Sequence, residues 1–304
     1  MSLNAQKYRA LLNSGEFIVS PGVYDGYSVR LVEAAGFKTA ATSGAAVSNA
    51  ILGQPDSGYL GLSENVNHCR NIARSVGIPV TADADTGYGN PMNVHFTVQQ
   101  FEEAGIAGVN IEDQVSPKRC GHMPGKEVIS LEEMVMKVEA ACLARRDDAF
   151  VVCARTDAIA VEGIEAACRR ARAYAEAGAD MIFADAVRSE EDIAAIVEAA
   201  RVPVTVNMGF GIRSRPTTPL FPIPRLKALG VRRISLPRML PAAAIHAMQQ
   251  ALSVMREVMT TGVPADRPDL LASIEDIMAL MGYAEMRERE ARLLHQDAPV
   301  RSHA

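Results

Sequence analysis

The sequence predicts an α/β fold, a (β/α)8 TIM barrel with extra C-terminal helices, and three observations support this. Short apolar runs of strand length alternate with amphipathic stretches of helix length, in eight successive pairs. The short runs are rich in Val, Ile, Ala and Thr and are apolar on both faces, as in a parallel sheet covered on both sides. No GxGxxG turn follows the first run, which favours the barrel over a doubly wound sheet.

The expected elements follow one another in chain order. Strands are expected at 17–25, 38–44, 79–85, 108–113, 150–158, 181–186, 203–209 and 232–237. Helices are expected near 27–35, 63–76, 92–104, 130–146, 163–177, 189–200, 223–229 and 241–260. Three of these helices end alike, in the stretches EEAGIAGVNI, AEAGADMIF and LKALGVRRI. In each, a glycine takes the left-handed position just past the helix, and an apolar run then enters the next strand.

A further helical stretch, ASIEDIMALMGYAEMRERE at 272–290, follows the last element that the barrel needs. We expect this segment to pack on a neighbouring subunit, because a barrel is complete without it. No low-complexity linker interrupts the chain. The sequence therefore predicts one barrel domain over residues 1–304, with 241–304 as a C-terminal helical extension.

Composition and charge argue against several classes of protein. The 304 residues are 48% hydrophobic and 22% charged, which is ordinary for a globular protein. The net charge of −5 gives no basic footprint for nucleic acid. No apolar run approaches the roughly 20 residues that span a bilayer, and no secretory signal is visible, so a cytoplasmic location is expected. The five cysteines are irregularly spaced and suggest neither a disulfide framework nor a CxxC metal site.

Polar residues end seven of the expected strands, whose other residues are largely apolar. Active sites of (β/α)8 barrels lie at the C-terminal ends of the strands, so these residues are candidates for a site. They are Tyr24, Ser43, which Gly44 follows, Asp83, Asp85, Glu112, Arg155, Asp185 and Asn207. Helix capping explains some Asp and Ser residues at such positions. It explains neither Arg155 nor the accumulation of carboxylates.

Three of the carboxylates indicate a metal site. Asp83 and Asp85 are two residues apart, so on a strand their side chains point the same way, and Glu112 ends the next strand. Carboxylates that converge repel one another unless a cation neutralises them. A hard, oxygen-preferring ion such as Mg²⁺ fits this pattern. The alternative is that one carboxylate caps a helix and another faces solvent.

Two further features suggest that the site binds an anion. The planar guanidinium of Arg155 suits a substrate carboxylate, although an ion pair with Asp157 or Glu112 is an alternative. The turn Ser43-Gly44-Ala45-Ala46 opens a helical stretch, and backbone N–H groups at such a turn favour an anion. By itself the SGAA turn is a weak signal.

The loop SPKRCGHMPGK, residues 116–126, follows the fourth expected strand directly and has neither helical nor strand periodicity. It places Cys120 among Lys118, Arg119 and His122, and positive neighbours favour a reactive thiol. A mobile lid that closes over the carboxylates could let Cys120 deliver or remove a proton. The alternative is an ordinary surface loop with an incidental thiol.

These motifs resemble the isocitrate lyase/phosphoenolpyruvate mutase superfamily over roughly residues 5–260. The resemblance rests on VTADADTGYGN, GVNIEDQVSPKRCGHMPGKEVIS, ARTDA and the SG turn, with further matches in LGQPDSG, AVEGIEAACRRARAYAEAGAD and TPLF. The KRCGH stretch is the most specific, and it is most similar to 2-methylisocitrate lyases and 2,3-dimethylmalate lyases.

The resemblance implies roles for particular residues. It implies Mg²⁺, with Mn²⁺ as a substitute, near Asp56, Asp83, Asp85 and Glu112. It implies that Ser43, Gly44 and Ala45 hold a 2-oxoacid carboxylate and that Arg155 binds substrate oxygens. Cys120 would be the proton donor, with Glu112, His122 and Asn207 positioning the second carboxylate or the lid. Tyr24 is a hypothesis for the base that removes the hydroxyl proton. The resemblance also implies a homotetramer, a dimer of dimers, that exchanges a C-terminal helix between subunits.

The implied activity is a Mg²⁺-dependent carbon–carbon lyase, acting in carboxylic acid metabolism on a 2-hydroxy di- or tricarboxylate. Three features depart from the methylisocitrate lyase pattern: SGAA replaces SGGG, Asp185 replaces a glutamate, and Gly209 replaces the glutamate of the seventh-strand turn. Arg213 and Arg215 add positive charge nearby. An oxaloacetate hydrolase or decarboxylase therefore remains an alternative, as does a phosphonopyruvate or carboxyphosphonoenolpyruvate mutase-type enzyme, although KRCGH argues against the mutases. A non-catalytic barrel is the third reading.

Overall fold

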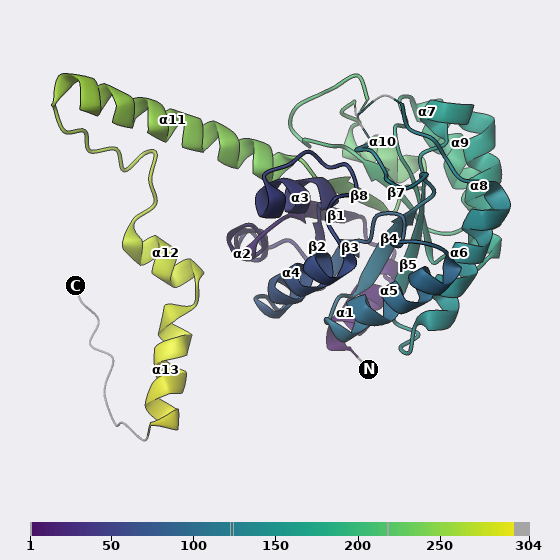
Figure 1. Ribbon diagram of the computed structural model, residues 1–304, viewed down its shortest axis with the longest axis horizontal. Helices are drawn as coiled ribbons and strands as arrows, with labels where there is room; N and C mark the ends of the chain where they lie inside the picture. Colours follow the sequence, from purple (N-terminus) through teal and green to yellow (C-terminus); the bar gives the residue numbers. More distant parts are fainter. Residues whose placement is uncertain (1, 122, 124, 218, 295–304) are drawn as a thin grey trace. The chain divides into compact units, whose positions relative to one another are not determined.

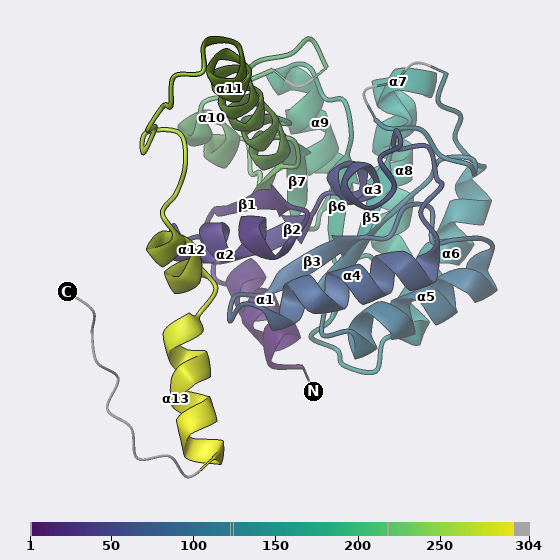
Figure 2. The same cartoon turned by 60° about the vertical axis from the view of Figure 1, so that its left-hand side comes forward.

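Eight parallel strands form a closed barrel in sequence order, with helices on the outside (Figures 1 and 2), which confirms the fold predicted from the sequence. The computed structural model describes residues 2–121, 123, 125–217 and 219–294. The strands are β1 (Ile18–Val23), β2 (Ala40–Thr42), β3 (Val80–Asp83), β4 (Gly108–Glu112), β5 (Val151–Thr156), β6 (Met181–Ala184), β7 (Val204–Asn207) and β8 (Arg233–Leu236).

The helices follow the predicted alternation. They are α1 (Leu3–Asn13), α2 (Gly26–Ala34), α3 (Gly44–Leu52), α4 (Leu62–Arg74), α5 (Pro91–Glu103), α6 (Leu131–Ala144), α7 (Ile159–Glu162), α8 (Ile164–Glu176), α9 (Glu190–Ala200), α10 (Ile223–Ala228) and α11 (Met239–Thr261). The strands are shorter than the apolar runs that predicted them, because the runs continue into the loops. Asp85 and Asp157 therefore stand just beyond their strands.

Side chains alternate between the two faces of each strand, so one core lies between the strands and the outer helices and a second lies inside the barrel. Outward-facing residues such as Val109, Val152 and Ile234 pack with helix residues such as Phe101 and Val138 in the main core. Inward-facing residues at the start of the strands form a smaller cluster that α1 closes. Its buried members are Tyr8, Leu12, Ile18, Ala107, Val151, Cys153, Met181 and Phe183. α1 was not among the predicted helices.

Residues 243–304 form a second compact unit, separate from residues 1–242. α11 begins in the first unit and continues into the second, which also contains α12 (Ile274–Leu280) and α13 (Tyr283–Leu293). The helical stretch predicted at 272–290 thus corresponds to two helices separated by Gly282 in the left-handed conformation. Exchange of a helix between subunits stays a prediction. Among the described residues, no helix is long and apolar enough to cross a membrane.

Candidate active site

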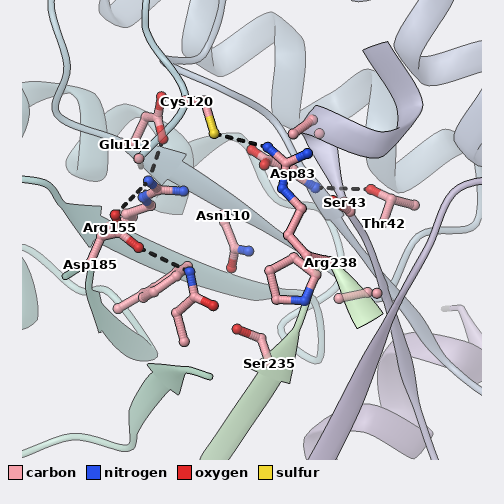
Figure 3. Close-up of a pocket in the computed structure, with 18 of the residues that line it drawn as sticks. Thr42, Ser43, Asp83, Asn110, Glu112, Cys120, Arg155, Asp185, Ser235 and Arg238 are labelled. Carbon is pink, nitrogen blue, oxygen red and sulfur yellow. Dashed lines mark hydrogen bonds and ion pairs between the residues drawn. The ribbon is translucent and has the colours of Figure 1, made fainter. Parts of the chain in front are cut away.

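A cavity lies at the C-terminal ends of the strands and opens to solvent (Figure 3). Most strand-end residues that the sequence analysis singled out line it. Its charged lining residues are Asp56, Asp83, Glu112, Asp185, Lys118, Arg119, Arg155, Arg233 and Arg238. Five of these nine are basic and four are acidic, so the cavity combines donors for an anion with oxygen ligands for a cation.

The turn after β2 packs directly on the end of β3. The backbone N–H of Asp83 donates to Thr42 Oγ1 at 3.1 Å, and Asp83 Oδ1 accepts from the Asp85 backbone N–H at 3.1 Å. A Cβ on Gly44 would stand 2.5 Å from Asp83 Oδ2, so only glycine allows this approach. Ser43 is the N-cap of α3, with its hydroxyl accepting from Ala46 N. The SG turn therefore places the N-terminus of α3 beside Asp83, one of the predicted metal ligands.

Lys118 bridges two of the predicted metal ligands. Its ammonium Nζ lies 2.6 Å from Asp56 Oδ1 and 2.9 Å from Asp85 Oδ1, and all three side chains are largely buried. Burial raises the pKa of Asp85 to about 6, assisted by Asp83 and Asp56 and opposed by Lys118. This crowding of negative charge is what a cation relieves, and here Lys118 supplies that positive charge.

Arg155 lies at the centre of a group of buried carboxylates (Figure 3). Its Nε and Nη2 donate to the two oxygens of Asp157 at 2.9 and 3.1 Å. Nε also lies 3.2 Å from Glu112 Oε2, and Nη2 lies 3.4 Å from Asp185 Oδ2. Both ion pairs that the sequence offered as alternatives to substrate binding are thus present. Burial raises the pKa of Glu112 well above its ordinary value, although Arg155 opposes the shift.

The loop that carries Cys120 is folded down onto this group. Its base is closed by a bridge between Gln114 and Val128, and the Gln114 side chain bonds Arg119 N and O at 3.0 and 2.9 Å. A Cβ on Gly121 would stand 2.3 Å from Asp185 Oδ2, so glycine is needed for this closure. Cys120 lines the cavity, and its Sγ accepts from Arg238 Nη2 at 2.9 Å (Figure 3).

The structure brings together most, but not all, of the predicted site residues. Ser43, Gly44, Ala45, Asp56, Asp83, Glu112, Cys120, Arg155 and Asn207 line the cavity. Asn207 Nδ2 donates to Asp185 Oδ1 at 3.1 Å. Asp85 stands behind Lys118 and does not itself line the cavity. Tyr24 is not in the cavity wall either, and its backbone carbonyl lies 2.6 Å from His68 Nε2. His122 lies outside the described residues.

Sequence reasoning missed several residues that complete the site. Arg238 follows β8 and reaches Cys120 Sγ, and its signal was only a basic residue after the last strand. Lys126 comes from the lid and lies 2.7 Å from Asp157 Oδ1 and 3.6 Å from Asp185 Oδ2. Lys126 had been one base among several in a polar loop, and only the fold of the loop brings it to Asp157.

The predicted ligands fit Mg²⁺ by the chemistry of their donor atoms. Asp56, Asp83 and Asp85 offer carboxylate oxygens, and Glu112 Oε1 is buried without a hydrogen-bond partner in the part of the chain that the structure describes. As the structure stands, no three His, Cys, Asp or Glu side chains in the described part of the chain are grouped so that they could hold a metal ion. Lys118 fills the space between Asp56 and Asp85. For an ion to reach both carboxylates, Lys118 has to withdraw.

Comparison with known proteins places this geometry in a family. A family model described as phosphoenolpyruvate phosphomutase matches residues 8–256. The chain is 41% identical to "Probable 2-methylisocitrate lyase 2" of Corynebacterium glutamicum over 278 residues, which is 91% of this chain and 88% of the relative. The chain belongs to the phosphoenolpyruvate mutase/isocitrate lyase superfamily. It is also 39% identical to 2,3-dimethylmalate lyase of Eubacterium barkeri, over 94% of this chain and 96% of the relative.

Solved structures of superfamily members show the same fold with different activities. Oxaloacetate acetylhydrolase in complex with 3,3-difluorooxalacetate has a TM-score of 0.88 and 33% identity, covering 97% of this chain and 98% of that chain. Phosphonopyruvate hydrolase in complex with oxalate and Mg²⁺ has a TM-score of 0.83 and 33% identity, covering 96% and 99%. Superfamily members thus include lyases, mutases and hydrolases, and at least one is seen with Mg²⁺. Fold similarity alone does not choose among these activities.

Proposed function

We propose that the protein is a Mg²⁺-dependent carbon–carbon lyase. It cleaves a 2-hydroxy di- or tricarboxylate of the 2-methylisocitrate or 2,3-dimethylmalate type into a 2-oxoacid and a second carboxylate. The observation that carries the proposal is the thiol of Cys120, which lies at the cavity and accepts a hydrogen bond from Arg238. A lyase of this kind needs a proton donor for its leaving carbanion, and a thiol at this position supplies one. The similarity to lyases at about 40% identity supports it.

Two groups would hold the substrate. The turn at Ser43 and Gly44 presents the first backbone N–H groups of α3, which is nine residues long, to the cavity. These donors suit the carboxylate of the 2-oxoacid half. Arg155, held rigid by Asp157, faces the same cavity and suits the oxygens that gain negative charge during cleavage.

The reaction then follows from the substrate's bonds. A base removes the proton of the 2-hydroxyl, the C2–C3 bond breaks, and C2 becomes the carbonyl carbon of the 2-oxoacid. The bonding electron pair passes to C3, where the adjacent carboxylate delocalises it. Cys120 gives its thiol proton to C3, which completes the second carboxylate product. The thiolate that remains accepts the hydrogen bond from Arg238 until solvent returns a proton.

The carboxylates of Asp56, Asp83, Asp85 and Glu112 would hold the Mg²⁺. When bound, the ion supplies Lewis-acid stabilisation of negative charge on the oxygens of the 2-oxoacid half. Substrate bound beneath the loop would displace water from the cavity, which would strengthen the electrostatic interactions there and protect the carbanion from bulk solvent.

Purified protein should release pyruvate or glyoxylate from at least one hydroxy acid in a panel of 2-methylisocitrate, isocitrate, 2,3-dimethylmalate and citramalate. Addition of EDTA should abolish the release, and excess Mg²⁺ or Mn²⁺ should restore it, because the four carboxylates suit a hard cation. A coupled assay for the 2-oxoacid measures this. Release that persists unchanged in EDTA would contradict a role for the metal.

Oxaloacetate hydrolysis is the second candidate, and one observation favours it. Asp185 is one carbon shorter than the glutamate of the methylisocitrate lyase pattern, and it lies beside Arg155 and Asn207. Oxaloacetate in the same panel distinguishes the two activities, since oxalate and acetate formed without cleavage of any hydroxy acid would indicate the hydrolase.

We also propose that the second unit packs on a further copy of the chain, in a homotetramer that exchanges a C-terminal helix. Apolar side chains are exposed along α11, namely Ile245, Met248, Leu252, Met255 and Met259. Covering such a stripe removes apolar surface from water. Sedimentation equilibrium should give the mass of four chains. A mass of one chain, 32.6 kDa, would contradict the assembly.

A further inference from the structure

The interior of the barrel contains a buried arginine that has no carboxylate partner in the described part of the chain. Arg233, on β8, is 1% exposed. Its Nε donates to Thr205 Oγ1 at 3.0 Å, and its Nη1 donates to Tyr8 OH at 2.7 Å. Nη1 also lies 3.5 Å from Thr81 Oγ1, so all three acceptors are neutral hydroxyls. Nη2 has no hydrogen-bond partner among the residues that the structure describes. A buried charge without a counter-charge costs several kcal/mol of folding free energy, so an arginine here calls for an explanation.

Three neighbouring polar groups share this condition. The hydroxyls of Ser20 and Ser235 and the Oδ1 of Asn110 are buried, and none of them has a hydrogen-bond partner within the described ranges. Together with Arg233 they line the same cavity as Lys118 and Arg155, and we call the part around those two residues the mouth. We call these four residues the barrel floor. Figure 3 shows the side chains of Asn110 and Ser235 within the pocket, below the level of Glu112 and Cys120.

The strand register gives the position of the floor. Ser20 on β1 pairs with Ser235 on β8, and Ile18 pairs with Arg233, so Arg233 lies one inward-facing layer below the two serines. Asn110 pairs with Asp83 at the edge of the proposed metal site. Because strands rise about 3.3 Å per residue, successive inward layers are about 7 Å apart along a strand. Arg233 therefore lies about 7 Å deeper along its strand than Ser235.

Charge distinguishes the floor from the mouth. Arg155 and Lys118 at the mouth already have carboxylates within ion-pair distance. At the floor, by contrast, Arg233 Nη2 and the two serine hydroxyls are buried donors without a hydrogen-bond partner among the described residues, and the three residues that carry them line the cavity. A site rich in donors, positively charged and shielded from bulk water selects an anion. The Asn110 amide can contribute a donor as well, since rotation of the amide turns its NH₂ group toward the same point.

We propose that the barrel floor is a carboxylate subsite. It binds the substrate carboxylate farthest from the Ser43–Gly44 turn, through Arg233 Nη2 and the hydroxyls of Ser20 and Ser235. The assignment of this carboxylate to the substrate rests on the proposed function. The subsite sets a minimum length for the acid that spans mouth and floor, and it distinguishes dicarboxylates from monocarboxylates of equal length.

Isothermal titration calorimetry of the full chain with Mg²⁺ tests the subsite without turnover. The probes are glutarate and succinate, with butyrate as the monocarboxylate that matches succinate in length. Arg233→Met should weaken binding of both dicarboxylates about tenfold or more, since a hydrogen bond to a charged group is lost. Butyrate binding should change little. Ser235→Ala, which keeps the charge and a similar volume, should weaken dicarboxylate binding about threefold to tenfold.

Two controls separate binding from folding. Tyr8→Phe removes the Arg233–Tyr8 hydrogen bond without touching Nη2, and it should leave dicarboxylate binding unchanged. If Arg233→Met does not fold, Ser235→Ala and Ser20→Ala still decide the question. Dicarboxylate binding as tight in the serine variants as in the unaltered chain would overturn the proposal.

A free inorganic anion is the other occupant with the same chemistry. Titration with chloride distinguishes an inorganic-anion site from a carboxylate subsite. A carboxylate subsite predicts that chloride displaces glutarate only weakly and that this displacement is lost in Arg233→Met. Arg233-dependent chloride binding together with equal affinity for glutarate and butyrate would overturn the assignment to a substrate arm. Arg233-dependent glutarate binding in a protein that cleaves no hydroxy acid would leave the subsite intact and refute only the lyase.

Discussion

Replacing Cys120 with serine is expected to lower the rate of carbon–carbon cleavage about 10²- to 10⁴-fold, the usual contribution of a positioned general acid. A serine hydroxyl is a far weaker acid than a thiol, so it gives its proton to a carbanion less readily. Arg238 would then donate to a hydroxyl that carries no charge. The rate of 2-oxoacid release at saturating substrate measures the effect.

Cys142→Ser is the matched control for this substitution. Cys142 lies on α6, outside the residues that line the cavity, and its thiol bonds the Gly178 carbonyl. This variant should cleave the substrate at the unaltered rate. Cleavage by Cys120→Ser that is as fast as cleavage by Cys142→Ser would remove the thiol from the mechanism and return the loop to a purely structural role.

Replacing Arg155 with methionine is expected to reduce both stability and activity. The side chain is 12% exposed and faces Glu112, Asp157 and Asp185, so its loss leaves three carboxylates without their shared counter-charge. Breaking a buried pair in this way costs about 3–5 kcal/mol of unfolding free energy. Lys126 offsets part of the cost, because it also lies against Asp157 and Asp185. Urea denaturation followed by circular dichroism measures the change.

Arg146→Met provides the comparison for a surface arginine. Arg146 and Glu103 form an ion pair at 2.8 Å, with side chains 62% and 49% exposed. Solvent screens such a pair, so its loss should cost about 0–1 kcal/mol. If Arg155→Met lowers the unfolding free energy no more than Arg146→Met does, then the ion pairs of Arg155 do not stabilise the fold. In that case its ion pairs would be incidental to the fold.

The arrangement of the barrel was predictable because its signals are local. Each strand is a short apolar run, each helix is amphipathic, and three glycines mark helix ends. Because the active sites of such barrels lie at the C-terminal ends of the strands, Asp83, Glu112 and Arg155 are predicted to lie in one site although they are far apart in the chain. The structure places all three in one cavity. The position of these residues in the sequence, together with the fold, was sufficient to predict that they line the cavity.

Other parts of the site depend on packing that no local pattern records. The approach of Arg238 to Cys120 joins residues 118 positions apart, and it depends on how the lid folds down. Lys118 was predicted as a base near the thiol, but it instead bridges Asp56 and Asp85. Arg233 lies within a run that is apolar apart from its two arginines and Ser235, and nothing in the sequence indicates that it points into the barrel.

The most direct test of the central claim is an analysis of products formed in D₂O. The protein, with Mg²⁺, is incubated with the hydroxy acid that it cleaves best, and both products are identified by NMR. The lyase mechanism predicts a 2-oxoacid and an equal amount of a carboxylate that carries one deuterium at the carbon released from the broken bond. Failure to cleave any hydroxy acid, with conversion of oxaloacetate to oxalate and acetate, would contradict the lyase and establish the hydrolase.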